Sequence, residues 1–207
     1  MVVTEPEYWL LAVAELSEAD AILKKLISCY PAASMQSRGD PFTTLARAIT
    51  GQQISVKAAD SIWQRLTALT EITPVGLRSQ PITNLRGCGY SQRKAEYLHD
   101  LSRHFAEQLI DAGAWSQMED ESIILELIKI RGIGRWSAEM FLMFNLLRPD
   151  VFPADDIGLQ KALIMHYPEL ASQNKAGWRQ HAERWRPWRS VATWYLWRSL
   201  DPVAVAY

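Results

Sequence analysis

Apolar side chains recur every three or four positions along most of the chain, the spacing that places them on one face of an α-helix. No segment alternates apolar and polar residues as a half-buried strand does, so the sequence predicts an all-α fold. The apolar runs predict helices at 21–27, 41–49, 56–66, about 91–101, 121–130, 135–144, about 157–166 and about 188–200.

Polar and proline residues mark where several of these helices begin. Asp40-Pro41 is a typical cap and first-position pair for the helix that follows. Ser17 with Asp20 is expected to cap the helix at 21–27. The proline-containing stretch 73–81 is expected to connect helices, and the glycine turn at 85–89 is interpreted as a plain turn in preference to a second DNA contact.

The segment 128–138 predicts two helices joined by a tight glycine hairpin. Gly132 and Gly134 allow positive φ values and close approach to another surface. The second helix starts near Arg135, and a helix N-terminus offers unpaired N–H groups and a positive dipole end that bind phosphate. Arg131 and Arg135 flank the hairpin and would attract DNA. Two interpretations remain open: a phosphate grip, or a connection whose glycines serve only steric needs.

Composition narrows the functional class only slightly. The 22 basic and 23 acidic residues give a net charge of −1, which excludes a polycationic coat but leaves room for a local basic face. Arginines at 179, 184, 186, 189 and 198 are candidates for part of that face.

The two cysteines, Cys29 and Cys88, have no metal-ligand spacing with the histidines, which favours a reduced intracellular setting. The N-terminal segment predicts neither a signal peptide nor a membrane span.

Four segments in this order, 48–55, 132–138, 150–156 and 182–190, resemble the helix–hairpin–helix DNA glycosylase superfamily, most closely its alkylation-repair branch, 3-methyladenine DNA glycosylase II. The resemblance implies two helical lobes with a central cleft: 40–150 with wedge loop and hairpin, and 1–39 plus 151–207 with the catalytic aspartate. It implies a monofunctional enzyme of base excision repair that flips alkylated purines, of the 3-methyladenine and 7-methylguanine type, out of double-stranded DNA and hydrolyses the N-glycosidic bond. We expect a monomer of the bacterial cytoplasm, associated with the nucleoid and not with membranes.

By its match to the family motif, Asp156 is expected to be the catalytic residue. Cleavage of an N-glycosidic bond develops positive charge on the sugar, and a carboxylate beside that charge stabilises the transition state and orients or deprotonates the attacking water. Asp155 is then expected to cap the helix that starts near Ile157. Without the resemblance, the Asp155-Asp156 pair is more typical of a helix cap alone.

The resemblance also implies the residues that contact the substrate. Trp136 and Trp197 are expected to line a pocket that attracts a cationic base, with Met140 where the family often has tyrosine. Gln53 is expected to be the wedge that fills the space left by the flipped base, although Gln52 and Gln53 could simply end a helix. Trp185 and Trp188 are expected to pack the lobe. The expected DNA-binding residues of the hairpin are Arg131, Gly132, Ile133, Gly134, Arg135 and Ser137.

Trp136 stands where bifunctional relatives carry the lysine that forms a Schiff base, so water is expected to be the nucleophile. We expect no cofactor and no metal held by side chains, and the cysteines of an iron–sulfur cluster are missing. Relatives often bind a structural monovalent cation on the carbonyls that correspond to Ile128, Ile130 and Ile133. Two rivals remain: a DNA-binding module without catalysis, and a glycosylase for mismatched or oxidised bases.

Overall fold

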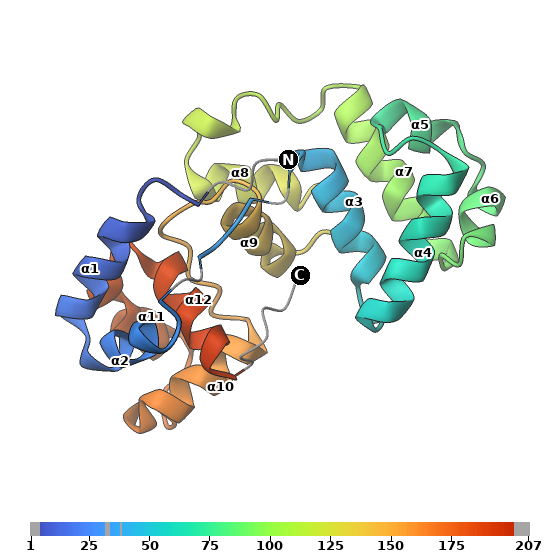
Figure 1. The fold of residues 1–207 in the computed structure, drawn as a ribbon. Coiled ribbons are helices and arrows are strands. Elements are labelled where there is room, and N and C mark those ends of the chain that lie inside the picture. Colours follow the sequence, from blue (N-terminus) through green and yellow to red (C-terminus); the bar gives the residue numbers. More distant parts are fainter. Residues whose placement is uncertain (1–4, 32–33, 38, 201–207) are drawn as a thin grey trace. The chain divides into compact units, whose positions relative to one another are not determined.

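The computed structural model describes residues 5–31, 34–37 and 39–200, and the regular elements within these ranges are all helical (Figure 1), which confirms the all-α prediction. No helix in these ranges combines the length and the apolar character that crossing a bilayer requires. The α-helices are α1 Trp9–Ala19, α2 Ala21–Cys29, α3 Pro41–Gly51, α4 Val56–Leu69, α5 Pro74–Ser79, α6 Ile82–Gly87, α7 Gln92–Ala106, α8 Asp120–Leu127, α9 Arg135–Phe144, α10 Ile157–His166, α11 Lys175–Ala182 and α12 Arg189–Leu200.

The chain forms two compact units. One comprises Arg38–Phe141 and is called the hairpin unit here; the other comprises Met1–Ser37 with Leu142–Tyr207 and is called the aspartate unit. The chain passes from the first to the second near the end of α9.

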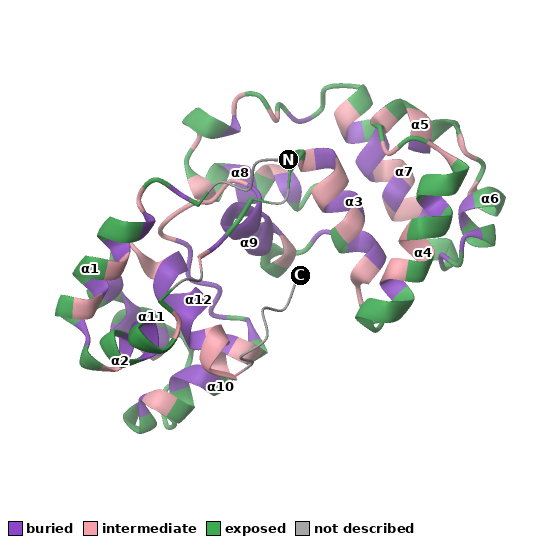
Figure 2. Cartoon of the chain, viewed as in Figure 1, coloured by how far each residue is buried: buried purple, intermediate pink, exposed green. Residues whose placement is uncertain are grey.

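The hairpin unit is built around α7, which packs against α3, α5 and α6. The inward face of α7 is apolar, with Leu98 and Leu101 fully buried, and Figure 2 shows these buried stretches in purple. Leu45 and Ile49 of α3 and the Trp115 ring complete this core. The apolar period of 3.6 residues therefore predicted the correct inward faces of α3 and α7.

The aspartate unit is organised around α12, which contacts α1, α2 and α10. Its central polar residue is Asp20, buried and serving as the N-cap of α2 by accepting hydrogen bonds from the backbone of Ile22 and Leu23. The second carboxylate oxygen accepts from the Tyr167 hydroxyl at 2.9 Å and from Trp185 Nε1 at 3.0 Å. The expectation that Ser17 takes part in this cap was wrong, because its hydroxyl donates to the Val13 carbonyl within α1.

Helix α1 has no counterpart among the predicted ranges, and neither do three short helices. The stretch 73–81 contains α5, where Pro74 occupies the first helical turn and the Thr73 hydroxyl caps it, and α6 follows directly after Pro81. Proline is well suited to the first turn of a helix, where its missing N–H is not needed, so the prolines that suggested a connection start helices instead. The third is α11, which begins after an Asn174 cap.

Candidate active site and DNA-binding elements

The glycine hairpin is present as predicted, between α8 and α9. Gly132 has a φ of +87°, and the N–H of Ile133 donates to the Ile130 carbonyl at 3.1 Å to close the turn. A Cβ atom on Gly132 would lie 2.2 Å from Cδ2 of Tyr97, so only glycine fits this position. Ile130 and Ile133 are buried in the unit, whereas Gly134, Arg135 and Trp136 at the start of α9 are exposed.

The two arginines that flank the hairpin are both paired with acidic side chains. Arg135 donates to both carboxylate oxygens of Glu121, at 2.8 and 2.5 Å, and lies 3.4 Å from Glu139. The hydrogen bond from Arg135 lowers the pKa of Glu121. Arg131 lies 3.3 Å from Glu96. The positive charge beside the hairpin is therefore smaller than the sequence alone suggests, and backbone N–H groups take a larger share of any phosphate binding.

The expected wedge residue lies in an exposed loop of unusual backbone geometry. The loop joins α3 to α4, with Gln52 as the C-cap of α3 and Ser55 as the N-cap of α4. Gln53 has a φ of +57°, in the left-handed region that non-glycine residues seldom adopt, and its side chain is exposed. Gln52 thus ends a helix, as the simpler interpretation held, while Gln53 is presented to solvent.

Contacts that the sequence did not reveal hold this loop. The side-chain amide of Gln52 donates to the Gly132 carbonyl at 2.8 Å. Lys94 Nζ donates to the carbonyls of Thr50 at 2.8 Å and Gln52 at 2.6 Å. Burial lowers the pKa of Lys94. These residues are 42 to 80 positions apart, so no local sequence signal indicated that they would meet.

Two of the expected pocket residues, Trp136 and Met140, lie four residues apart on α9, so they share one face of that helix. The exposed fraction of Trp136 is 38%, high for an indole, whereas that of Met140 is 9%. Ser137 is half-buried between them along the chain. Part of the Trp136 side chain is therefore accessible to solvent at the first turn of α9.

Asp156 lies in the aspartate unit as the N-cap of α10, where its Oδ1 accepts from the Leu159 N–H at 2.6 Å. The expectation that Asp155 would be the cap was wrong. Asp155 instead forms an ion pair with Lys175 of α11. Two adjacent aspartates both satisfy the sequence rule for a cap, and the ion pair with Lys175 comes from α11, which was not predicted.

The carboxylate of Asp156 is held by a second, tertiary hydrogen bond. Nε1 of Trp197 donates to the same Oδ1 at 2.8 Å, and the indole stacks on Phe144 with ring centroids 5.9 Å apart. Gly158 leaves space for this contact, because a Cβ there would lie 3.0 Å from Asp156 Oδ1 and 3.3 Å from Trp197 Nε1. Asp156 has an exposed fraction of only 9%, yet its neighbours Asp155 and Ile157 are exposed, so the carboxylate lies just below the surface of its unit.

Several of the arginines predicted to form a basic face contact acidic side chains or aromatic rings within the aspartate unit. Arg189 contacts the Asp150 carboxylate at 2.6 and 3.0 Å, and Arg186 lies 3.2 Å from Asp150 and 2.9 Å from Glu183. The Arg198 guanidinium lies over the rings of Tyr30 and Trp194. Their charge is partly offset by neighbouring carboxylates and rings, so they contribute less to a basic face than expected. Trp185 is fully buried, and Trp188 stacks on Tyr8, so both pack the unit as predicted.

The described ranges contain no group of three or more His, Cys, Asp or Glu side chains arranged to hold a metal ion. The hairpin carbonyls of Ile128, Ile130 and Ile133 are hard oxygen ligands of the kind that alkali cations bind. The Ile130 carbonyl also accepts the Ile133 N–H, which keeps the turn closed. A monovalent cation on these carbonyls stays a prediction.

Comparison with known proteins gives consistent matches. The family model for the HhH-GPD superfamily of base excision DNA repair proteins matches residues 46–187. DNA-3-methyladenine glycosylase 1 of Schizosaccharomyces pombe is 34% identical over 185 residues, which is 86% of this chain and 80% of the relative. A crystal structure of DNA-3-methyladenine glycosidase from Bacillus halodurans has a TM-score of 0.84 and 32% identity, covering 92% of this chain and 89% of the other. The S. pombe 3-methyladenine DNA glycosylase in complex with abasic DNA has a TM-score of 0.77 and 31% identity, covering 95% and 99%.

Proposed function

Because this chain belongs to the HhH-GPD superfamily of base excision DNA repair proteins, we propose that it is a monofunctional DNA glycosylase that removes alkylated purines from double-stranded DNA. The observation that carries the proposal is the Asp156 carboxylate, which two donors hold at the N-terminus of α10 just below the surface of its unit. A helix cap of this kind also occurs in DNA-binding modules without catalysis, so release of free base is the measurement that separates the two classes.

The chemistry follows from that carboxylate. As the bond between base and sugar lengthens, the sugar becomes an oxocarbenium-like cation, and an anionic oxygen beside it lowers the energy of the transition state. Asp156 stabilises this charge and orients the water that attacks the sugar carbon. An alkylated purine that carries a positive charge leaves as a neutral base, so the protein does not have to stabilise a charged leaving group. Trp136 occupies the position of the lyase lysine, so water is the nucleophile and the strand remains intact.

The hairpin unit supplies the grip on DNA. Backbone N–H groups at residues 132–137, apart from that of Ile133, which donates to the Ile130 carbonyl, bind a phosphate at the N-terminus of α9, with Arg131, Arg135 and Ser137 beside it. Gln53 enters the duplex and fills the space of the flipped base, and its amide group hydrogen-bonds the unpaired partner base. Its exposure and its left-handed backbone support this role.

We propose that Trp136, Met140 and Trp197 contact the flipped base. Indole faces attract a cationic base by about 0.5–2 kcal/mol per ring, which favours 3-methyladenine and 7-methylguanine over undamaged purines. Met140 replaces an aromatic ring with a polarisable thioether and adapts the pocket to bases of different shape. We propose that the enzyme acts as a monomer on the chromosomal DNA of a bacterium, with the hairpin unit binding the DNA backbone and the aspartate unit supplying the catalytic carboxylate.

The test is release of free base from methylated duplex DNA, followed by chromatography. Wild type should release 3-methyladenine and 7-methylguanine and leave alkali-labile abasic sites in intact strands. Asp156→Asn should lose at least about a hundredfold in rate, since it replaces a charge aimed at the transition state. Asp155→Asn is the matched control, because it removes an exposed carboxylate one residue away, and it should retain activity within about threefold.

Each other outcome contradicts a specific part of the proposal. DNA binding by wild type without release of any base would favour the non-catalytic module. Release of oxidised or mismatched bases in place of methylated ones would favour the other enzyme class. Full activity of Asp156→Asn would remove this carboxylate from the mechanism.

A further inference from the structure

One helix, α7, holds both loops that the proposed function brings to DNA, and this inference rests on that function. On successive turns of α7, Lys94 contacts the wedge loop (51–55), while Tyr97 and Asp100 contact the hairpin (128–134). The two loops belong to segments about 80 residues apart in sequence. Their shared support therefore comes from tertiary structure alone.

Lys94 fixes the end of α3 from which the wedge loop starts. Its ammonium group donates to the Thr50 and Gln52 carbonyls, among the last carbonyls of that helix, which no intrahelical N–H can satisfy. A cation at a helix C-terminus also interacts favourably with the helix dipole. Gln53 follows directly and has a φ of +57°, a conformation that persists only where the surrounding structure imposes it.

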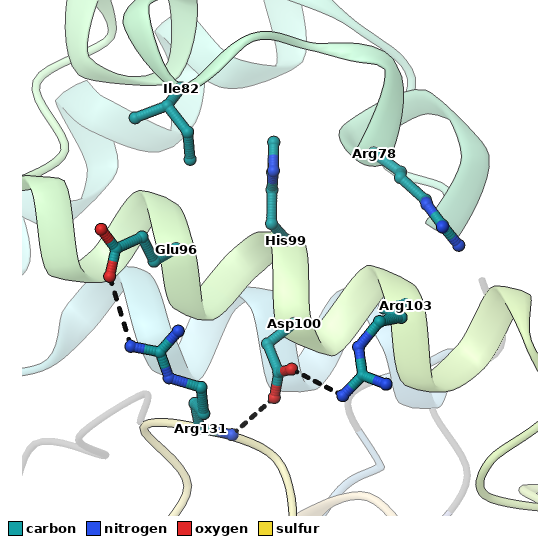
Figure 3. A pocket seen from close by; sticks show the side chains of 7 residues that line it. All are labelled: Arg78, Ile82, Glu96, His99, Asp100, Arg103 and Arg131. Atoms are coloured by element: carbon teal, nitrogen blue, oxygen red, sulfur yellow. Dashed lines mark hydrogen bonds and ion pairs between the residues drawn. The ribbon is translucent and has the colours of Figure 1, made fainter.

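Asp100 and Tyr97 fix the hairpin. Asp100 Oδ2 accepts the backbone N–H of Arg131 at 2.8 Å, while Oδ1 of the same carboxylate accepts from Arg103 at 2.9 Å; Figure 3 shows the Asp100 carboxylate between these two residues. The ring of Tyr97 lies directly against Gly132, where a Cβ would be only 2.2 Å away. Asp100 therefore fixes the position of the hairpin on α7, and the Tyr97 ring prevents the hairpin from moving closer to that helix.

Gln52 joins the two loops directly. Its side-chain amide donates to the Gly132 carbonyl at 2.8 Å, while its own backbone carbonyl accepts from Lys94. One residue thus connects the wedge loop with both α7 and the hairpin, immediately before Gln53.

We propose that Gln52, Lys94 and Asp100 are positioning residues that make the wedge loop and the hairpin one rigid element, so that the grip on the DNA backbone sets where Gln53 enters the base stack. None of the three touches the reacting atoms. Their effect is confined to substrates whose base must be forced out of the stack. A lesion opposite an abasic site has no partner base to unpair and depends much less on the wedge.

The experiment compares single-turnover base release from two duplexes that carry the same alkylated base, one opposite its normal partner and one opposite an abasic site. Gln52→Met keeps the length of the side chain but removes its donor, and Gln64→Met, at an exposed position of α4, is the matched control. Loss of one hydrogen bond predicts that Gln52→Met slows release from the paired duplex about two- to tenfold. Release opposite the abasic site should stay within about twofold, as should release by Gln64→Met on both duplexes.

Two further variants separate positioning from general stability. Lys94→Met, like Gln52→Met, should slow base release from the paired duplex and not from the duplex with the opposing abasic site. Lys94→Arg keeps the charge and the donors, so it should release base at the wild-type rate. Combining Gln52→Met with Gln53→Ala should add nothing to the effect of Gln53→Ala alone, because an absent wedge needs no positioning. Equal slowing on both duplexes, or additive effects of the two substitutions, would overturn the inference.

Hydrogen exchange tests the coupling independently of activity. Gln52→Met should speed exchange of the backbone amides of Arg131 and Ile133, which donate to Asp100 and Ile130 within the seated hairpin. Unchanged exchange at both amides would refute the coupling. If wild type released no base from either duplex, the proposed function would fail, and the exchange measurement would still decide whether the two loops are joined.

Discussion

The hydrogen bond from the indole of Trp197 to the Asp156 carboxylate leads to a sharp prediction for Trp197→Phe. The phenyl ring preserves a stacking surface against Phe144 but removes the Nε1–H donor that lies 2.8 Å from Oδ1. A hydrogen bond to a charged group contributes about 1.5–3 kcal/mol. At about 1.4 kcal/mol per factor of ten, its complete loss corresponds to about a 10- to 150-fold decrease in rate. The Leu159 N–H still donates to the same oxygen, so a decrease in the lower half of that range is expected.

The assay is single-turnover release of base with enzyme in excess, together with the affinity of each variant for duplex DNA that contains an abasic site. Trp197→Phe should lower the rate of the chemical step and leave the affinity for abasic DNA within about threefold. Phe144→Leu is the control, because it removes the stacking partner and keeps the indole donor, and it should change the rate far less. A rate for Trp197→Phe within twofold of wild type, or a loss that appears only in affinity, would refute the role assigned to the indole N–H.

Three further predictions concern the supporting structure. Gly158→Ala places a Cβ 3.0 Å from Asp156 Oδ1, so base release should fall about tenfold or more while thermal unfolding changes by less than about 1 kcal/mol. Gly132→Ala should destabilise the protein by about 2 kcal/mol or more in urea unfolding, because of its positive φ and the Tyr97 ring, whereas Gly134→Ala, with open space around its Cβ, should stay close to wild type in the same measurement. Burial acts to raise the pKa of Asp20, but its hydrogen bonds from Trp185, Leu23, Tyr167 and Ile22 outweigh this and lower it. The ionised Asp20 therefore contributes its full stabilisation above its unfolded pKa of 3.8, and this contribution is lost as the pH falls through the lower pKa of the folded state. Asp20→Asn should flatten this part of the acid-unfolding curve, measured by circular dichroism.

Most of the longer helices and the hairpin were predictable because their signals are local, although α1 was not predicted. Asp40-Pro41 specifies the start of α3, and the apolar period specifies which side of α7 is buried. The hairpin glycines lie between two strongly apolar runs, and Gly132 adopts the positive φ that its sequence context suggested. Short helices such as α5 contain too few residues to show a period, so the prolines at their starts indicated connections between helices.

The functional details that the sequence did not predict depend on tertiary contacts between residues far apart in the chain. The Trp197 donor lies 41 residues from Asp156, and the Gln52 donor lies 80 residues from Gly132, so neither contact has a sequence signature. Helix caps were misassigned where two acceptors stood side by side, as at Asp155 and Asp156, because the choice depends on where the Lys175 ammonium lies. The pairing of Arg131 and Arg135 with Glu96 and Glu121 likewise follows from the packing of helices, and it reverses the simple expectation of free basic charge.

The most direct test of the account is whether Asp156 recognises positive charge at the position of the sugar. Duplexes that carry a cationic pyrrolidine abasic analogue and a neutral tetrahydrofuran analogue differ at that site in the positive charge and the N–H donors of the pyrrolidine nitrogen, and binding of each can be measured by fluorescence anisotropy. Wild type and Asp155→Asn should bind the cationic duplex at least about tenfold more tightly than the neutral one, and Asp156→Asn should bind both equally. An undiminished preference of Asp156→Asn for the cationic duplex would contradict the central claim.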